Sequence, residues 1–358
     1  MKESARIDKW LWAARIYKTR SIAADACKNG RVTVGGVNRK PSFIIKRGDV
    51  VSVKKAPITY SFEVLDCIEQ RVGAKMLFGV YKNVTSSHTL VCGILNITPD
   101  SFSDGGKWDE PQKALEHALE MQALGADIID VGAQSTRPGS TRLSAVSADE
   151  ENARLIPVLD LLKGRITVPI SVDTFYPECA RTALTHGAKI INDVSGEASD
   201  EMAKVVSEFG AGWIIMHNPA GADAVPVYEN GVSDDVLDFF GRAARVAKSH
   251  GIPASSLCFD PGIGFAKSYE DNLRLIRDIG KIKTDGSALM SAASRKRVIG
   301  TASGETDAAK RDPGTVALHT ASILNGADVI RAHDVFSAVQ SARVADALKK
   351  IYGEANGG

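Results

Sequence analysis

Eight short apolar runs recur between residues 89 and 335, and segments with helical spacing separate them. Examples of the separating segments are Pro111–Leu124 and Tyr269–Ile279. Continuous apolar strands that alternate with helices predict a parallel sheet covered on both faces. Eight such units over about 250 residues predict a (β/α)₈ TIM barrel, an α/β fold. The runs are Thr89–Ile97, Asp127–Ala133, Pro169–Thr174, Ile190–Ser195, Gly212–Asn218, Leu257–Ile263, Ala288–Ala293 and Val329–Val335.

Each run ends in a polar side chain that is able to do chemistry. The C-terminal ends of the strands of such a barrel meet at one mouth, where active sites lie. Polar residues that are scattered along the sequence would therefore converge there, which favours an enzyme over a scaffold. The residues at or just past the ends are Asn96, Thr136 with Arg137, Asp173, Asn192, His217, Asp260, Lys296, and Arg331 with His333.

The first 87 residues have a different pattern. Ala5–Ile16 carries apolar residues at helical spacing, and Ser21–Asn29 is expected to form a second helix that ends at Gly30. Short alternating segments at Arg31–Val34 and Asp49–Val53 predict strands. We therefore expect a small α+β domain before the barrel.

The charge of the chain is divided between these two parts. Residues 1–87 hold 17 Lys and Arg against 7 Asp and Glu, whereas the rest of the 358-residue chain holds 27 against 36. We place the boundary near Asn83–His88, which gives domains 1–87 and 88–358. The basic balance of the first domain predicts a polyanionic partner.

Composition excludes several classes of protein. The hydrophobic content of 44% is ordinary for a globular chain. The sequence contains no apolar stretch of about 18 residues, the length that a membrane-spanning helix needs. The N-terminus has no apolar signal core, so we expect no export. The five cysteines are distant from one another and include no Cys-x-x-Cys pair, which argues against a disulfide framework and a cysteine zinc site. We expect a cytoplasmic protein.

Three segments of the first domain resemble the RNA-binding S4 domain, named after a ribosomal protein. They are Arg6-Ile-Asp-Lys-Trp-Leu, Lys18-Thr-Arg-Ser-Ile-Ala and Gly30-Arg-Val-Thr-Val-Gly-Gly, and the resemblance covers roughly residues 4–55. It implies that the basic helix pair contacts phosphates of structured RNA by shape more than by sequence. On charge alone, a solvated basic face is an equal alternative. The RNA-binding candidates are Arg6, Arg15, Lys18, Arg20 and Arg31.

Two groups of residues in the barrel have distinct chemistry. Asp173, Asn192 and Asp260 supply acceptors and an amide, which suit a flat heterocycle that carries amino and ring N–H groups. For Asp173 in Ser-Val-Asp-Thr, a helix N-cap is the alternative.

The second group is Arg137, Arg331, His333 and Asn96. Its cations would repel one another without an anion between them, and guanidinium groups bind phosphate in bidentate fashion. Asn96 offers a carbonyl oxygen suited to Mg²⁺ beside a diphosphate. His333 taken alone is as consistent with a structural, hydrogen-bonded histidine.

The segments that carry these residues together resemble dihydropteroate synthase from about residue 88 to residue 350. The resemblance implies that the chain condenses 6-hydroxymethyl-7,8-dihydropterin diphosphate with 4-aminobenzoate and releases diphosphate, with Mg²⁺ as cofactor. It also implies a homodimer. The segments are Gly93-Ile-Leu-Asn-Ile-Thr-Pro-Asp-Ser-Phe-Ser, Gly132-Ala-Gln-Ser-Thr-Arg-Pro-Gly, Ser171-Val-Asp-Thr, Ile191-Asn-Asp-Val-Ser, Asp260-Pro-Gly-Ile-Gly-Phe, Ser294-Arg-Lys and Arg331-Ala-His-Asp-Val.

The resemblance also assigns roles to individual residues. The pterin ring would contact Asp173, Asn192, Asp260, Lys296 and Met216, and the diphosphate would contact Arg137, Arg331 and His333. The aminobenzoate pocket would be lined by Thr136, Pro138, Phe265, Lys296 and Arg297, and Asn96 would bind the metal.

The chain departs from the family at several positions near these segments, and Ser291-Ala-Ala stands where Val-Gly is frequent. Arg297 stands where serine is usual, Gln134 where glutamate is usual, and Ala266 where glycine is common. These changes put the affinity for aminobenzoate and the sensitivity to sulfonamides in doubt. Two alternatives remain open: a pterin-binding barrel that transfers methyl groups, and an RNA-binding protein with a degenerate barrel. The first has no use for a diphosphate site, and the second does not explain the intact polar set.

Overall fold

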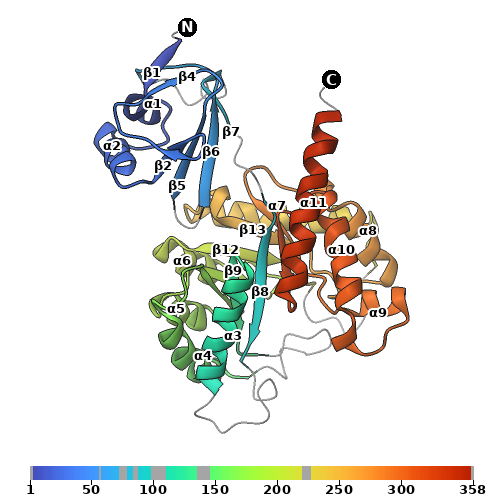
Figure 1. Ribbon diagram of the computed structural model, residues 1–358. Coiled ribbons are helices and arrows are strands. Elements are labelled where there is room, and N and C mark those ends of the chain that lie inside the picture. Colours follow the sequence, from blue (N-terminus) through green and yellow to red (C-terminus); the bar gives the residue numbers. More distant parts are fainter. Residues whose placement is uncertain are drawn as a thin grey trace. The chain divides into compact units, whose positions relative to one another are not determined.

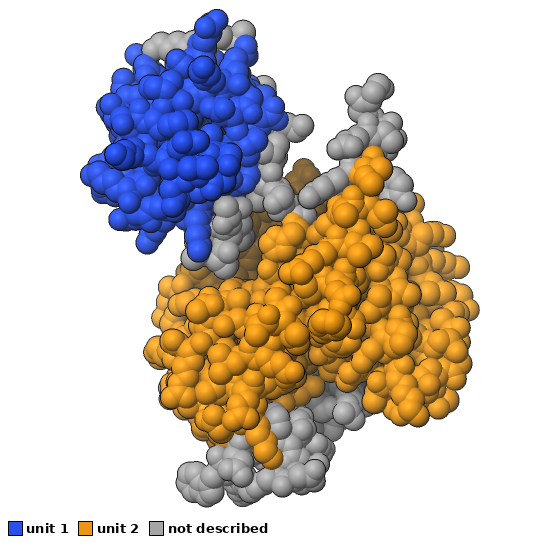
Figure 2. Space-filling view, in the orientation of Figure 1, with its two compact units in different colours: residues 1–87 blue, residues 88–358 orange. Residues whose placement is uncertain are grey.

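The computed structural model describes residues 3–55, 58–71, 79–83, 88–97, 110–134, 146–219 and 227–355. The chain divides into two compact units, Met1–Ser87 and His88–Gly358, which Figure 2 colours separately. Each unit has an apolar core of its own. Within the described ranges, no helix has the length and apolarity needed to cross a bilayer.

The second unit is a closed barrel of eight parallel strands. Sequential strands pair with one another, and the last strand pairs with the first, so the predicted fold is confirmed. The strands are β8 (Leu90–Asn96), β9 (Ile128–Gly132), β10 (Ile170–Asp173), β11 (Ile190–Asp193), β12 (Gly212–Met216), β13 (Leu257–Asp260), β14 (Ala288–Ser291) and β15 (Val329–Ala332).

Helices follow the strands and surround the barrel (Figure 1). Local signals set their ends: Ser147 and Ser199 cap two helices by accepting backbone N–H bonds, and Ser268 forms a capping box with Asp271. The helices are α3 (Glu110–Leu124), α4 (Ala148–Leu162), α5 (Pro177–Thr185), α6 (Asp200–Phe209), α7 (Val232–Ser249), α8 (Tyr269–Arg277), α9 (Arg297–Ser303), α10 (Asp312–Leu324) and α11 (Val335–Ala355).

Strand register brings the polar strand ends to one level. Asp173 pairs with Asn192 on one side and with Gly132 on the other, and Gly132 in turn pairs with Asn96. Residues far apart in sequence therefore lie side by side at the C-terminal ends of four consecutive strands.

The first unit combines a five-stranded antiparallel sheet with two helices and a two-stranded ladder. Ala5 and Arg6 lie in a strand that pairs with Ile44 and Ile45, so the expected helix begins at Ile7 and not at Ala5. The reason is that this ladder satisfies backbone groups that a helix start would leave unpaired. The elements are β1 (Ser4–Arg6), α1 (Ile7–Ala13), α2 (Arg20–Lys28), β2 (Val32–Val34), β3 (Val37–Asn38), β4 (Ile44–Lys46), β5 (Val50–Lys55), β6 (Ile58–Val64) and β7 (Tyr81–Asn83).

Candidate functional site

Arg331 lies at the centre of the polar cluster in the barrel. Its Nε donates to Asp130 Oδ2 at 2.7 Å, and its Nη2 donates to Asp173 Oδ2 at 3.2 Å. Burial acts to lower the pKa of Arg331, but the two carboxylates outweigh it and raise that pKa. Arg331 therefore stays charged and joins three strands, β9, β10 and β15.

The expectation that the cations need an external anion between them is wrong for Arg331. Arg331 needs no external anion to balance its charge, because two buried carboxylates already do so. Asp130, which was not among the predicted site residues, is completely buried in β9. The available signal was a single carboxylate inside the otherwise apolar strand Ile128–Gly132, since an isolated buried charge requires a partner.

Asn192 has a fixed orientation because of the same cluster. Its Nδ2 donates to Asp130 Oδ2 at 2.9 Å. A carboxylate only accepts hydrogen bonds, so the amide nitrogen must face Asp130 and the carbonyl oxygen must face the other way. Asn192 can therefore offer an acceptor to an N–H group of a ligand.

Asp260 adds a second acceptor two strands away. It is buried at the end of β13, in register with Met216 of β12, and its Oδ1 accepts the backbone N–H of Gly262 at 2.8 Å. Burial raises the pKa of Asp260, and the charge of Lys296 opposes that rise. Met216 is buried beside this carboxylate.

Lys296 and Phe265 come together from different loops. The Lys296 ammonium donates to the carbonyl of Ile263 and lies 4.5 Å from the centroid of the Phe265 ring. Burial lowers the pKa of Lys296 to about 8, although Asp260 acts to raise it. Gly264 permits this approach, since it has a φ of +84° and a Cβ there would lie 2.9 Å from Lys296 Cδ.

His333 is held by Ser294. Its Nδ1 lies 2.9 Å from Ser294 Oγ, and its backbone N–H donates to the same oxygen. Burial lowers the pKa of His333 to about 4, with Arg295 and Arg331 adding to the effect. The imidazole is therefore neutral at physiological pH. It can act as a hydrogen-bonding group toward a ligand, but not as a permanent cation.

Asn96 lies near Gly132 and Asp173 and is exposed at the end of β8. A Cβ placed on Gly132 would be 3.5 Å from Asn96 Oδ1 and 3.8 Å from Asp173 Cβ. Among the described residues, no group of three His, Cys, Asp or Glu side chains could hold a metal by itself. Thr136, Arg137 and Pro138 lie outside the described residues.

His217 follows one of the predicted strands, but it is a structural residue and not part of the polar cluster. Its Nε2 lies 2.9 Å from Asp235 of α7, and its ring packs edge-on against Phe239 of the same helix. Its backbone N–H donates to the carbonyl of Asp260. It therefore fastens a covering helix to the barrel, and burial lowers its pKa to about 4.

Two of the departures, Ala266 and Gln134, have a visible structural effect. Arg297 is exposed at the first turn of α9, next to Lys296. Ala266 has a φ of +44°, a conformation that costs a side chain more than it costs glycine. The carbonyl of Ala266 accepts the Tyr228 hydroxyl at 2.8 Å, which helps to keep the residue in that conformation.

The other departure with such an effect, Gln134, is buried after β9. Its Nε2 donates to Glu151 of α4, a carboxylate with no solvent exposure. Burial raises the pKa of Glu151, and bonds from Thr174 and Gln134 oppose that rise. An amide at position 134 can donate to a carboxylate, whereas a glutamate could do so only if it kept a proton.

Gln134→Glu is expected to make stability more dependent on pH. One carboxyl of the new pair would retain its proton, so its pKa in the folded protein would exceed the value of about 4.3 in the unfolded chain. Stability is then lost as pH rises, because the unfolded chain releases that proton first. From about pH 5 to about pH 8, we expect the unfolding free energy to fall by roughly 1–3 kcal/mol more than in the wild type.

Chemical denaturation at the two pH values measures this difference. Gln112→Glu is the matched control, because Gln112 donates to Glu116 at 3.3 Å in an exposed Gln–Glu pair on α3. Water screens that pair, so its variant should follow the wild type. Equal pH dependence for both variants would show that burial at position 134 has no such effect.

The RNA-binding candidates of the first unit fall into two sets. Arg6 and Arg20 both bind the buried carboxylate of Asp8, with N–O distances between 3.0 and 3.2 Å. Bonds to both guanidinium groups lower the pKa of Asp8, although burial acts to raise it. The remaining candidates, Arg15, Lys18 and Arg31, are exposed.

Comparisons with known proteins agree with this geometry. A family model described as pterin binding enzyme matches residues 92–333, and a model of the S4 domain matches residues 5–51. Dihydropteroate synthase of Streptococcus pyogenes serotype M6 is 41% identical over 256 residues, which cover 71% of this chain and 93% of that protein. A folate synthesis bifunctional protein of Arabidopsis thaliana is 41% identical over 280 residues, and the chain spans only 57% of its length.

Solved structures give the same result. The dihydropteroate synthase of Clostridium difficile, crystallised in the presence of pteroic acid, has a TM-score of 0.68 at 39% identity and covers 73% of this chain and 97% of its own. The Xanthomonas albilineans enzyme with 4-aminobenzoic acid also has a TM-score of 0.68, at 36% identity, and covers 76% of this chain and 96% of its own.

Proposed function

This chain belongs to the dihydropteroate synthases, a group of pterin binding enzymes, and from that premise we propose the reaction of residues 88–358. The barrel joins 6-hydroxymethyl-7,8-dihydropterin diphosphate to 4-aminobenzoate and releases diphosphate, as a transferase in folate biosynthesis. The observation that carries this proposal is the cluster of Asp130, Asp173, Asn192 and Arg331 at the mouth of the barrel, with Asp260 near it.

The pterin ring is bound through its amino and N–H groups. Asn192 presents its carbonyl oxygen because Asp130 holds its nitrogen, and Asp260 presents a carboxylate. Asp173, held by Arg331, lies next to Asn192 in register. Acceptors on adjacent strands match the donors on one edge of a flat ring. Lys296 and Met216 complete the surroundings of the ring.

The diphosphate binds next to the pterin, toward the ends of β15 and β8, where Arg331 and Asn96 lie. Arg331, Arg137 and the neutral imidazole of His333 donate to its oxygens, and Asn96 would hold Mg²⁺ through Oδ1. The fit rests on the donor type, since Mg²⁺ prefers oxygen ligands and usually shares them with phosphates and water. The ion would offset the negative charge that develops on the leaving group.

The chemical step requires no strong nucleophile from the protein. The amine of aminobenzoate attacks the methylene carbon of the pterin, the carbon–oxygen bond to diphosphate breaks, and the amine loses one proton. The electron-rich pterin stabilises the positive charge on that carbon. Cations placed in advance around the leaving group lower the barrier, because they need no rearrangement during the reaction. Release of diphosphate by purified protein supplied with both substrates and Mg²⁺ tests the proposal, and absence of turnover would contradict it.

Arg297→Ser is expected to change the Michaelis constant for aminobenzoate and leave pterin affinity unaltered. Arg297 follows Lys296 and is exposed, so it can pair with the substrate carboxylate but not with the buried acceptors. Loss of such a pair costs roughly 0.2–1 kcal/mol, a rise in the constant of up to about fivefold. Steady-state kinetics measures it, with the equally exposed Arg343→Ser on α11 as control. An unchanged constant would show that Arg297 points away from the pocket.

We also propose that residues 1–87 bind structured RNA. The support is the S4 match, the excess of basic residues, and the exposed Arg15, Lys18 and Arg31. Asp8 pairs with both Arg6 and Arg20, which keeps these two guanidinium groups close together on the same unit.

RNA affinity is expected to fall steeply with salt, because phosphate binding releases counterions. Lys18→Ala with Arg31→Ala should weaken binding and reduce the slope of log affinity against log salt by about 1–2. A gel-shift titration at several salt concentrations measures both quantities. Diphosphate release should be unchanged, because both residues lie in the first unit. A slope near zero in the wild type would contradict the proposal.

Two coarser proposals concern assembly and compartment. We propose a homodimer, supported by Phe336, Val344 and Ile351, which leave large apolar side chains exposed on α11. We propose a cytoplasmic location, supported by five cysteines that are all free thiols.

A further inference from the structure

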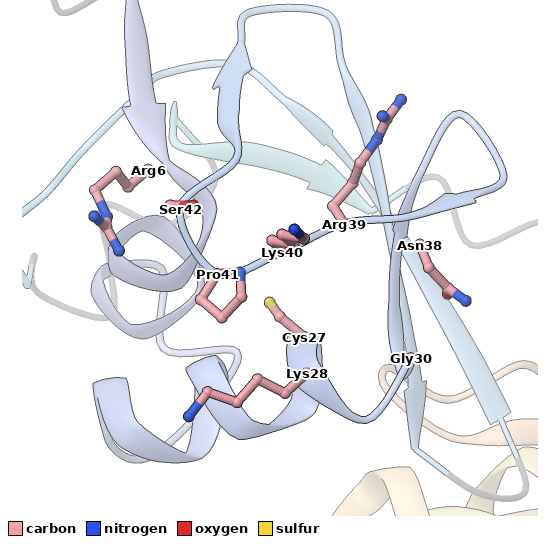
Figure 3. A pocket seen from close by; sticks show the side chains of 9 residues that line it. All are labelled: Arg6, Cys27, Lys28, Gly30, Asn38, Arg39, Lys40, Pro41 and Ser42. Atoms are coloured by element: carbon pink, nitrogen blue, oxygen red, sulfur yellow. The ribbon is translucent and has the colours of Figure 1, made fainter.

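A cavity of about 630 Å³ opens on the surface of the first unit. It lies between the last turn of α2 and the segment that joins β3 to β4 (Figure 3). In this view the Cys27 thiol points toward Pro41 and Lys40, with the Lys28 side chain to one side. Side chains that line it include Arg6, Cys27, Lys28, Arg39, Lys40 and Ser42.

The lining is strongly basic. Four of the lining side chains are cations, and no carboxylate lines the cavity. Arg6 is paired with Asp8, and Lys28 has a long, exposed contact of 3.4 Å with Asp25. Among the described residues, Arg39 and Lys40 form no ion pair. The uncompensated charge favours an anionic ligand.

The floor of the cavity is neutral. Cys27 is buried, and burial raises the pKa of its thiol to about 11, so it carries no charge. Its thiol offers a polarisable surface against which a flat ring can pack.

Arg39 also lines the cavity, and Figure 3 shows its guanidinium pointing away from Cys27. Its guanidinium lies over the Phe43 ring, 4.3 Å from the centroid. Its Nε is buried, with no hydrogen-bond partner among the described residues. Stacking on Phe43 restricts the plane of the guanidinium, so its hydrogen-bonding edge keeps a defined direction.

The volume of the cavity favours a nucleotide over a single phosphate group. A volume of about 630 Å³ lies within the range of small-molecule pockets and exceeds what one phosphate group fills. A nucleotide combines a phosphate for the lysines with a flat base for the neutral floor. In duplex RNA the bases are stacked inside the helix and cannot enter, whereas an unpaired nucleotide can turn outward.

We propose that this cavity receives a single unpaired nucleotide of an RNA bound by the first unit. This inference rests on the RNA binding proposed above. Arg6 belongs both to the cavity and to the guanidinium pair on Asp8, so the two surfaces are continuous. The unit would then prefer RNA that carries a bulge or a loop over RNA that is fully paired.

The test compares two RNA hairpins that differ only by one bulged nucleotide. With the full-length protein, the bulged hairpin should bind about tenfold tighter, as expected for one charge-assisted contact between a lysine and the phosphate of the bulged nucleotide. Lys28→Ala with Lys40→Ala should remove that preference and lower the affinity for the paired hairpin only slightly. Lys46→Ala with Lys54→Ala is the matched control, since both lysines are exposed strand residues outside the cavity. It should retain the tenfold preference.

A photocrosslink locates the nucleotide independently of any substitution. A 4-thiouridine at the bulge should crosslink within residues 27–42. Equal binding of the two hairpins, or a crosslink that maps only elsewhere, would overturn the cavity proposal while RNA binding stands. Failure of both hairpins to bind at low salt would instead overturn RNA binding itself, and the cavity proposal with it.

Discussion

Replacing Arg331 with methionine is expected to reduce kcat/KM at least about tenfold and to lower the free energy of unfolding by roughly 3–5 kcal/mol. The substitution removes the cation between Asp130 and Asp173, which are both buried. It also removes a donor to the diphosphate. Steady-state kinetics and chemical denaturation measure the two losses.

A second substitution separates these two losses. Adding Asp130→Asn to Arg331→Met removes one of the stranded carboxylates, so part of the stability should return while turnover stays low. Arg343→Met, at an exposed position on α11, should behave as the wild type. If Arg331→Met retained normal stability and turnover, the carboxylates would not depend on this cation.

Asp260→Asn is expected to weaken pterin binding by about 10–100-fold, because one carboxylate acceptor becomes an amide that also presents a donor. The fold should survive. Asn can still accept the Gly262 N–H through its own oxygen, and burial already disfavours the charged form of Asp260. Calorimetry with dihydropterin diphosphate measures the affinity, and thermal denaturation checks the fold. Asp173→Asn should also weaken binding, with an added loss of stability because Asp173 pairs with Arg331.

Asp193→Asn is the matched control for that experiment. Asp193 is a buried aspartate at the end of β11, but its Oδ1 accepts the backbone N–H of Ser195, and it follows Asn192 on the opposite face of the strand. Pterin affinity should therefore be unchanged. Unaltered affinity in Asp260→Asn as well would remove Asp260 from the pocket.

The sequence was sufficient to predict the barrel because its strands are buried on both faces. A segment such as Leu257–Asp260 is apolar until its last residue, so apolar runs mark both the strands and the ends that carry chemistry. Asp173, Asn192 and Asp260 could be grouped for the same reason. Each lies at or next to the C-terminal end of its strand, and the strand register brings those ends to the same level of the barrel.

What remained hidden depends on contacts across the barrel. Nothing near Asp130 in sequence indicates that its partner is Arg331, and nothing near Gln134 points to Glu151 on the next helix. The direction of His217 toward Asp235 was equally invisible, because a residue just past a strand can point to either side. In the first unit, the pairing of Arg6 with Ile44 replaced the start of a helix with a strand.

Synthesis on the ribosome puts Asp130 and Asp173 in place long before the residue that balances them. Arg331 follows Asp130 by 201 positions and Asp173 by 158. A nascent chain that ends before β15 therefore has two carboxylates that must stay in water, and β9 and β10 cannot bury their ends at full stability. Addition of the last strand, β15, closes the barrel and also supplies Arg331, the cation that pairs with these two carboxylates. A message truncated before codon 331 would yield an open chain that cellular proteases can degrade, whereas residues 1–87, with a core of their own, could already have folded.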